Sequence, residues 1–239
     1  ERMFGLTGPQ GNHGEDVKEY WWYLDALPSH AWLRWRYHYP QRAFPYDDLV
    51  AESARRGRLD PEYELIDTGV FDDDRFWVVE VDHAKAGPND LRTRIRVTNA
   101  GPETATIHVL PTVWFRNTWS WELDGERPEL RTTDDPSRLS ARHHTLGRFT
   151  VEVAPGPDGV LPEWLVCDNE TNAAAFYGPG ATSRSPFTKD AFHRHVVNGE
   201  DATNPDDAGT KAALHYRFMV PPGESVELCL RFAAEFHPD

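Results

Sequence analysis

Alternation of apolar and polar residues with a period of two dominates the chain. Residues 32–39 read WLRWRYHY, in which bulky apolar side chains alternate with Arg34, Arg36 and His38. Residues 91–98, LRTRIRVT, alternate in the same way. Successive side chains of a β-strand point to opposite faces, so this period predicts strands that bury one face. Tyr20 to Tyr23 are bulky without alternation, which predicts a strand covered on both faces.

Turn residues punctuate these extended runs. LRTRIRVT passes through NAGPE into TATIHVLPTVWF, and KAALHYRFMV passes through PPGE into SVELCLRFAAEF. Such turns predict two hairpins. Further strand candidates are EYWWYLDA, EYELIDTG, RFWVVEVDHA, GRFTVEVA and EWLVCDN. The expected fold is therefore all-β, an antiparallel β-sandwich that forms a single domain over residues 1–239.

One short connecting helix and two long loops interrupt this pattern. Residues 47–56, DDLVAESARR, begin with acids, end with bases and are followed by Gly57, as expected for a helix. Residues 116–138 and 178–210 are too long for sandwich turns. Loops of that length are usually functional or held by a partner surface, so we look for function there.

Charge and composition narrow the class of protein. The 239 residues hold 39 acids and 25 bases, a formal charge of −14, which repels phosphate backbones and anionic lipids. We expect no nucleic-acid partner and no membrane. The amino terminus lacks the features of a signal peptide, which favours a cytoplasmic protein with Cys167 and Cys229 reduced. Because it opens on ERMFGLTGPQ without an initiator Met, we expect a fragment of a longer protein.

Two groups of histidines invite a metal-site interpretation. His13, Glu15 and Asp16 lie in a glycine-rich loop and carry suitable ligand atoms, but closely spaced acids are more often solvated. His193 and His195 would share a side if FHRHVV were extended. Without a third and fourth ligand, a surface strand with two histidines is the better interpretation. The sequence therefore predicts no metal site.

Acids and tryptophans gather in the first long loop. Trp119 and Trp121 precede a run of acids that would suit a sugar site, because aromatic faces stack on sugar rings and carboxylates bind hydroxyls. The acids are Glu122, Asp124, Glu126 and Glu129. The favoured alternative is a charged loop anchored by two core tryptophans. The chain has no nucleophile elbow, P-loop or dinucleotide motif, so we expect no cofactor.

Several long segments resemble one enzyme family. They are ERMFGLTGPQGNHGEDVKEYWWYLDALPSH, YPQRAFPYDDLV, EYELIDTGVFDDDRFWVVEVDHAKAGPNDLRTRIRVTN, LPTVWFRNTWSW and NPDDAGTKAALHYRFMVPPGE. Together they resemble the amino-terminal region of large bacterial glucosidases of glycoside hydrolase family 63, the processing α-glucosidase and mannosylglycerate hydrolase-like group. The resemblance implies a β-sandwich of the super-sandwich type, followed by an (α/α)6 toroid that carries out inverting hydrolysis of an α-glycosidic bond.

The resemblance implies a non-catalytic role for this chain. The toroid, with its catalytic acid and base, would follow residue 239, so no catalytic residue is carried over. We expect the sandwich to pack on that carboxyl-terminal catalytic domain and to help shape its cleft for an oligosaccharide or small α-glucoside. The predicted interface residues are Asn12, His13, Glu15, Asp16, Arg116, Asn117, Trp119 and Trp121. Alternatives are a stand-alone carbohydrate-binding module, or a hydrolase with two cooperating carboxylates of its own.

Overall fold

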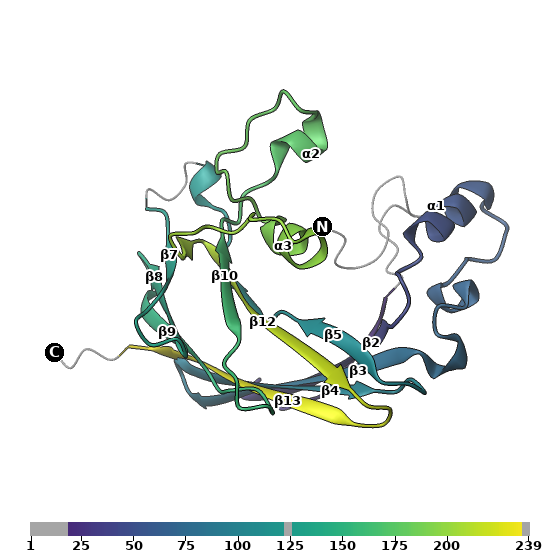
Figure 1. Cartoon of the computed structure of the whole chain (residues 1–239), viewed down its shortest axis with the longest axis horizontal. Helices are drawn as coiled ribbons and strands as arrows, with labels where there is room; N and C mark the ends of the chain where they lie inside the picture. The colour runs from purple at the N-terminus through teal and green to yellow at the C-terminus, as the bar shows by residue number, and fades with distance from the viewer. Residues whose placement is uncertain (1–18, 122–125, 236–239) are drawn as a thin grey trace. The chain divides into compact units, whose positions relative to one another are not determined.

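Antiparallel β-strands form the framework of the computed structural model, which describes residues 19–121 and 126–235 (Figure 1). The strands are β1 (Tyr20–Ala26), β2 (Trp32–Pro40), β3 (Phe76–Gly87), β4 (Asp90–Asn99), β5 (Ala105–Val109), β6 (Thr112–Trp114), β7 (Glu129–Thr132), β8 (Arg138–His143), β9 (Gly147–Val153), β10 (Glu163–Cys167), β11 (Ala208–Gly209), β12 (Lys211–Val220) and β13 (Ser225–Ala234). The helices of the described residues are short: α1 (Tyr46–Arg55), α2 (Ala173–Tyr177) and α3 (Ala191–Asn198), with 3-10 turns η2 (Leu65–Thr68), η3 (Asp72–Asp74) and η4 (Trp119–Trp121). The predicted all-β, antiparallel fold is confirmed.

The described chain divides into two compact units. Unit 1 holds the residues up to Ala84, with Arg94–Ile107 and Phe218–Glu227. Unit 2 holds Lys85–Thr93, the residues from His108 to Arg217, and those from Leu228 on. Strands β3, β4, β5, β12 and β13 contribute residues to both units. The single-domain organisation of residues 1–239 stays a prediction.

Unit 1 is a strand ladder with a helical cap. Strands β1, β2, β3 and β4 are neighbours in that order. Ion pairs cross the ladder, and Asp82 accepts from both Arg34 and Arg94 at 2.7 Å, which lowers the pKa of this carboxyl to about 2. In the cap, Leu49 of α1 and Leu65 of η2 are buried with Val70.

The predicted strand EYELIDTG is wrong, because these residues turn through η2. The carboxylate of Asp67 accepts a hydrogen bond from the backbone N–H of Glu64 at 2.8 Å, as at the start of a helix. Gly69 then adopts φ +70°, a left-handed conformation that ends the turn. These local bonds outweigh the apparent alternation.

Unit 2 is the sandwich. Its first sheet has the order β13-β9-β8-β7-β11, and its second contains β10 beside β12, which also pairs with β6. Leu130, Leu139 and Val151 of the first sheet pack in one cluster with Val166 and Ala212 of the second. Apolar side chains of two facing sheets therefore form the core, as in other sandwiches.

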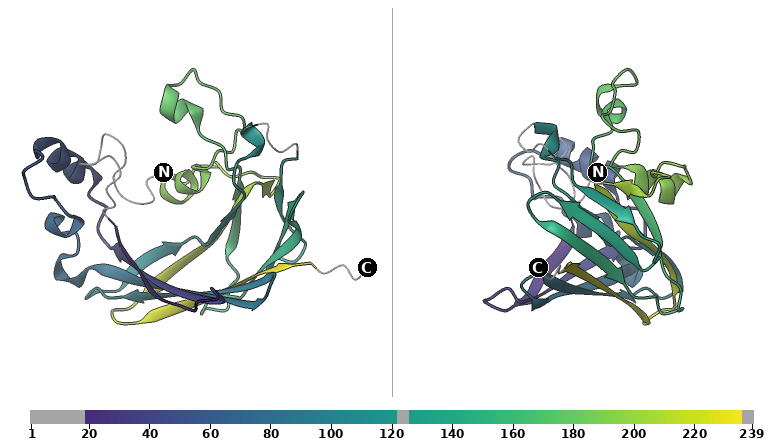
Figure 2. Two further views of the ribbon diagram at one scale, coloured as in Figure 1. Left: turned by 180° about the vertical axis from the view of Figure 1, so that it is seen from behind. Right: turned by 90° about the vertical axis from the view of Figure 1, so that its left-hand side faces the viewer.

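A helix covers the other side of the second sheet. Ala191 and Phe192 of α3 are buried against Leu165 of β10 and Ala213 of β12, and α3 lies beside these strands in every view (Figures 1 and 2). The residues FHRHVV, predicted as a surface strand, belong to this helix. Helical spacing explains the error, because Phe192 and Val196, four residues apart, both pack on the sheet.

Both predicted hairpins are wrong, although their strands are present. Strands β4 and β5 belong to different sheets, and so do β12 and β13. A buried asparagine binds both ends of the turn between β12 and β13: Asn99 Nδ2 donates to Val220 O at 2.8 Å, and its backbone N–H donates to Glu224 O at 3.0 Å. The turn is thus bound to Asn99.

The predicted helix is confirmed to within a residue as α1, whereas α2 and α3 were not predicted. The two long loops are partly ordered into elements: residues 116–138 contain η4 and β7, and residues 178–210 contain α3 and β11. No helix among the described residues is both long and apolar enough to cross a membrane.

Candidate functional site

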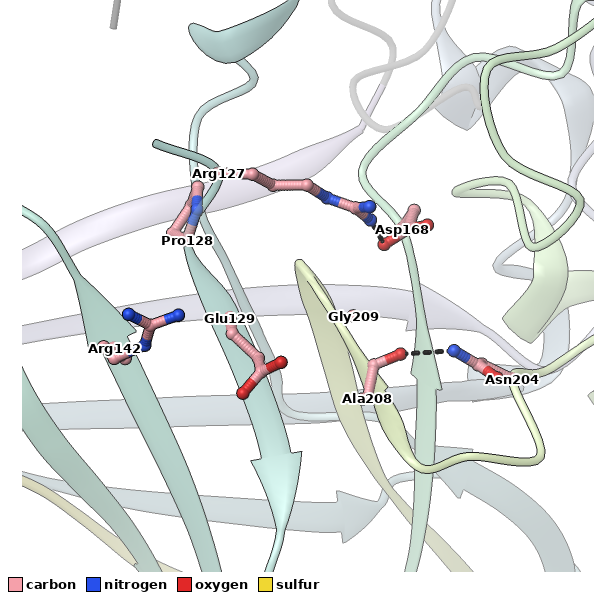
Figure 3. Close-up of a pocket in the computed structure, with 8 residues that line it drawn as sticks. All are labelled: Arg127, Pro128, Glu129, Arg142, Asp168, Asn204, Ala208 and Gly209. Atoms are coloured by element: carbon pink, nitrogen blue, oxygen red, sulfur yellow. Dashed lines mark hydrogen bonds and ion pairs between the residues drawn. The ribbon is translucent and has the colours of Figure 1, made fainter. Parts of the chain in front are cut away.

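A polar pocket of about 230 Å³ lies where β10 ends in unit 2 (Figure 3). Its lining comes from β7, β8 and β11 and from the segments that follow β10 and precede β7. The lining residues are Arg127, Pro128, Glu129, Arg142, Asp168, Asn204, Ala208 and Gly209. Of the predicted sugar-site acids, Glu129 lines this pocket.

Close approach of two backbones positions the pocket. A Cβ atom on Gly209 would overlap the carbonyl oxygen of Cys167, so β11 can lie this close to the end of β10 only with glycine there. Thr210 N–H donates to the same carbonyl at 3.0 Å, and the Thr210 hydroxyl accepts from Asn169 N–H at 2.8 Å. These bonds fix the chain that carries Asp168.

Charged groups dominate the lining. Arg127 donates to the carboxylate of Asp168, which is only 6% exposed (Figure 3). Glu129 and Arg142 are cross-strand partners on β7 and β8. Asn204 Nδ2 is already engaged with Ala208 O at 2.6 Å. The pocket therefore offers fixed donors and acceptors suited to hydroxyl groups.

The pocket lacks two features of a sugar-processing site. Its volume of about 230 Å³ is below the range of about 300–1,000 Å³ typical of small-molecule sites, and would suit at most one sugar ring. None of its lining residues is aromatic, so a ring has no face on which to stack. The arrangement resembles a polar contact surface more than an enclosed active site.

The loop that contains the predicted interface residues Asn117 and Trp119 is bonded to the segment that follows the pocket residue Asp168. Asn117 Nδ2 donates to Asn169 O at 2.8 Å, and Asn169 Nδ2 donates back to Phe115 O at 2.9 Å. Trp119 Nε1 donates to Glu170 Oε1 at 2.9 Å. The structure therefore brings residues about 50 positions apart into one bonded surface.

The two tryptophans of η4 have different roles. Trp119 is half-buried, and its indole N–H donates to the side chain of the buried Glu170. Trp121 is 53% exposed, and the guanidinium of Arg116 lies 5.1 Å from its ring centroid. The favoured anchoring interpretation fits Trp119, while Trp121 is a surface residue.

Other predicted residues are placed as follows. Glu126 is exposed. Asn12, His13, Glu15 and Asp16, with Glu122 and Asp124, lie outside the described residues. The sequence pattern does not single out Asp168, Arg127, Arg142 or Asn204; the polar run DNE after the apolar EWLVC is the available signal for Asp168.

Strand β1 exposes aromatic side chains of this chain in unit 1, so the covering of both its faces stays a prediction for the chain together with a partner. Trp22 and Tyr23 are 41% and 76% exposed, and Trp21 and Leu24 are also exposed. Among the described strands, β1 pairs only with β2, at the end of the order. An apolar edge strand of this kind is a typical interaction surface.

A half-buried acid precedes this strand. Burial raises the pKa of Glu19 from 4.5 to about 7, although a hydrogen bond with Tyr37 opposes the shift. Carboxyl groups with perturbed pKa values often mark functional sites. Among the described residues, however, the pKa of Glu19 is shifted by burial and by Tyr37, and not by a second carboxylate. We therefore treat it as a determinant of pH-dependent stability.

In the wild type, the free energy of unfolding should fall as the pH rises through the pKa of Glu19. Replacement of Glu19 by Gln is expected to abolish this fall. Between pH 4.5 and about 7 the folded chain binds more protons at Glu19 than the unfolded chain, so the free energy of unfolding falls as pH rises. Between pH 4 and pH 8, the free energy of unfolding of Glu19→Gln should therefore rise relative to that of the wild type by about 1–2 kcal/mol, after allowance for solvent screening. Urea unfolding at both pH values measures it. Glu224→Gln, at an exposed turn, should show no such change.

Comparisons with known proteins give one curated relative and a weak structural similarity. The chain is 36% identical over 263 residues to the uncharacterized protein YMR196W of Saccharomyces cerevisiae, with 97% of this chain and 24% of the relative covered. It therefore spans about a quarter of that relative's length. No family model matches. A solved structure of a candidate aldose 1-epimerase from Escherichia coli covers 91% of this chain and 69% of its own at a TM-score of 0.37 and 10% identity, which carries no argument about function.

Proposed function

We propose that this chain is a non-catalytic β-sandwich domain of a glucosidase-like protein, and that it packs on the remainder of the same polypeptide. The observation that carries the proposal is the exposed aromatic edge strand β1. The long curated relative supports it, because 76% of that protein lies outside the matched region, as the 24% coverage implies. The resemblance to family 63 supplies the expected partner, a helical catalytic domain.

The exposure of β1 favours a protein partner over solvent. Trp21, Trp22 and Leu24 each remain more than a third exposed, and Trp21 packs edge-to-face on Tyr23 with their ring centroids 5.2 Å apart. Large aromatic side chains are enriched at the buried centres of interfaces. A neighbouring domain that covers this strand would bury its apolar side chains and could pair with the edge that no other described strand occupies.

The polar pocket supports a secondary role in lining the partner's substrate cleft. Arg127 forms an ion pair with Asp168 there, Glu129 is paired with Arg131, and Trp121 adds an exposed aromatic face on a neighbouring segment. Groups of this kind bind sugar hydroxyls once a second wall encloses them. In the whole protein, the pocket would then contribute substrate contacts without supplying the acid or base.

The proposal predicts that the chain alone binds no sugar saturably. The alternative, a stand-alone carbohydrate-binding module, has in its favour the exposed Trp121 beneath Arg116. Isothermal titration calorimetry of the chain with maltose, kojibiose-type and mannosylglycerate-type sugars separates the two. Saturable heat that disappears in Trp121→Ala but persists in Trp114→Ala, another exposed tryptophan, would establish the module and contradict the packing role.

The same preparation tests the hydrolase alternative. Two carboxylates, Glu129 and Asp168, line the pocket, and glycoside hydrolysis needs such a pair at a defined separation. We expect no turnover of an aryl α-glucoside by the chain alone. Turnover lost in both Glu129→Gln and Asp168→Asn would instead make the sandwich catalytic.

A further inference from the structure

Three potential metal ligands converge on the side of the second sheet that α3 covers. Glu163 and His215 are direct cross-strand partners on β10 and β12, and His195 comes from α3. His215 Nδ1 lies 3.6 Å from Glu163 Oε2, and His195 Nε2 lies 3.9 Å from the same oxygen. All three ligand atoms lie within 4.8 Å of one another.

The second nitrogen of each imidazole is already engaged. His195 Nδ1 lies 3.2 Å from the backbone carbonyl of Glu200, which can only accept, so Nδ1 is the donor in this bond and Nε2 is the nitrogen whose lone pair a metal would use. His215 Nε2 lies 2.7 Å from His108 Nδ1 on β5. A proton on His215 Nε2, donated to His108, leaves the Nδ1 lone pair facing Glu163. Outer bonds of this kind orient metal-binding histidines in known sites.

We propose that Glu163, His195 and His215 form a site for a divalent transition metal of the zinc class, with His108 as the residue that orients His215. Two imidazoles and one carboxylate match the ligand preference of Zn²⁺. Tetrahedral bonds of about 2.0–2.1 Å place ligand atoms about 3.3–3.4 Å apart. The two separations from Glu163 Oε2, 3.6 and 3.9 Å, therefore need only a small closure, and the two imidazole nitrogens start within 4.8 Å of each other.

The two histidine side chains are largely buried, whereas the carboxylate of Glu163 is exposed, so the carboxylate can move toward a metal and solvent can reach that side of the site. The side chains of His215 and His195 are 15% and 27% exposed and are held by the packed helix and strand, whereas that of Glu163 is 59% exposed and can rotate. A metal would complete its coordination with water on the Glu163 side. It would also tie α3 to the second sheet at a point beyond the apolar contacts of Phe192.

The competing explanation is a plain ion pair between Glu163 and protonated histidine. Distances of 3.6 and 3.9 Å are long for a charge-assisted hydrogen bond, which is typically about 2.7–2.9 Å. One carboxylate oxygen faces both imidazoles, an arrangement that a shared cation explains directly. The site is independent of the proposed packing role, so either can fail alone.

Zn²⁺ titration of the tag-free, chelator-treated chain tests the site. We expect one Zn²⁺ per chain by calorimetry, and Co²⁺ absorption of tetrahedral intensity. His195→Ala and His215→Ala should each weaken binding by more than about 100-fold, and His108→Leu by about 10-fold, as for an outer residue. Glu163→Gln, at an exposed position, should weaken binding without affecting the fold.

His193→Ala is the matched control. His193 is exposed on the same helix, two residues from His195 and therefore on another face, so binding should be unchanged. Circular dichroism verifies that each variant is folded. Two results would overturn the assignment. One is that the wild-type chain binds neither Zn²⁺ nor Co²⁺ saturably, and the other is that Glu163→Gln, His195→Ala and His215→Ala all bind the metal as tightly as the wild type.

Discussion

Asn99→Ala is expected to lower the free energy of unfolding by about 3 kcal/mol. Asn99 is fully buried, and its Nδ2 donates to Glu103 O and Val220 O, both at 2.8 Å. Its Oδ1 accepts from Gln41 Nε2 at 2.6 Å and from Gly101 N–H at 2.9 Å. Removal of the amide leaves the N–H of Gly101 and the carbonyl of Val220, both on buried residues, without this partner, and each such group costs about 1–3 kcal/mol.

Urea unfolding followed by fluorescence measures this change, and two variants sharpen it. Asn99→Asp keeps the size and the acceptor but loses both donors, so it should be at least as damaging as alanine. Thr98→Ala, next on the same strand, removes one exposed hydroxyl contact with Ser225 and should cost less than about 1 kcal/mol. Equal effects at positions 98 and 99 would show that Asn99 does not hold the β12–β13 turn.

Trp119→Ala is expected to destabilise unit 2 by about 3 kcal/mol and to release the loop beside the pocket. The indole packs half-buried, and its N–H is bound to the buried carboxylate of Glu170 at 2.9 Å. Without the indole, the half-buried site loses a large apolar side chain, and the buried carboxyl of Glu170 loses a hydrogen-bond donor. Differential scanning fluorimetry and urea unfolding measure the loss.

Two matched variants separate the anchor from its surface neighbour. Trp119→Phe retains an aromatic ring but not the N–H, so it should recover roughly half of the stability. Trp121→Ala, in the same 3-10 turn but 53% exposed, should change the free energy of unfolding by less than about 0.5 kcal/mol. Comparable destabilisation by Trp119→Ala and Trp121→Ala would contradict the anchoring role.

Period-two alternation predicted strands well but could not predict their partners. The extents of β2 and β4 follow directly from WLRWRYHY and LRTRIRVT. Pairing depends on which faces meet, and the turn before β13 looks like a hairpin until a buried Asn99, 121 residues before Val220, binds it. A short segment with local capping bonds, such as η2, also imitates a strand in sequence.

The candidate sites illustrate the same limit. The loop with Trp119 was predicted from its length and composition, because such features are local. Asp168 and Arg127 became neighbours only through folding across 41 positions. The segment FHRHVV suggests His193 as the companion of His195, whereas the helix turns His193 away and places His195 close to Glu163 and His215.

The most direct test of the packing role is hydroxyl-radical footprinting of β1 in the isolated chain and in the whole polypeptide. Trp21, Trp22 and Tyr23 should be labelled rapidly in the isolated chain, because all are exposed there. In the whole polypeptide their labelling should fall several-fold, while Met219, which is 75% exposed on another strand, keeps its rate as an internal control. Equal labelling of β1 in both proteins would contradict the proposal that this sandwich docks on the rest of its chain through β1.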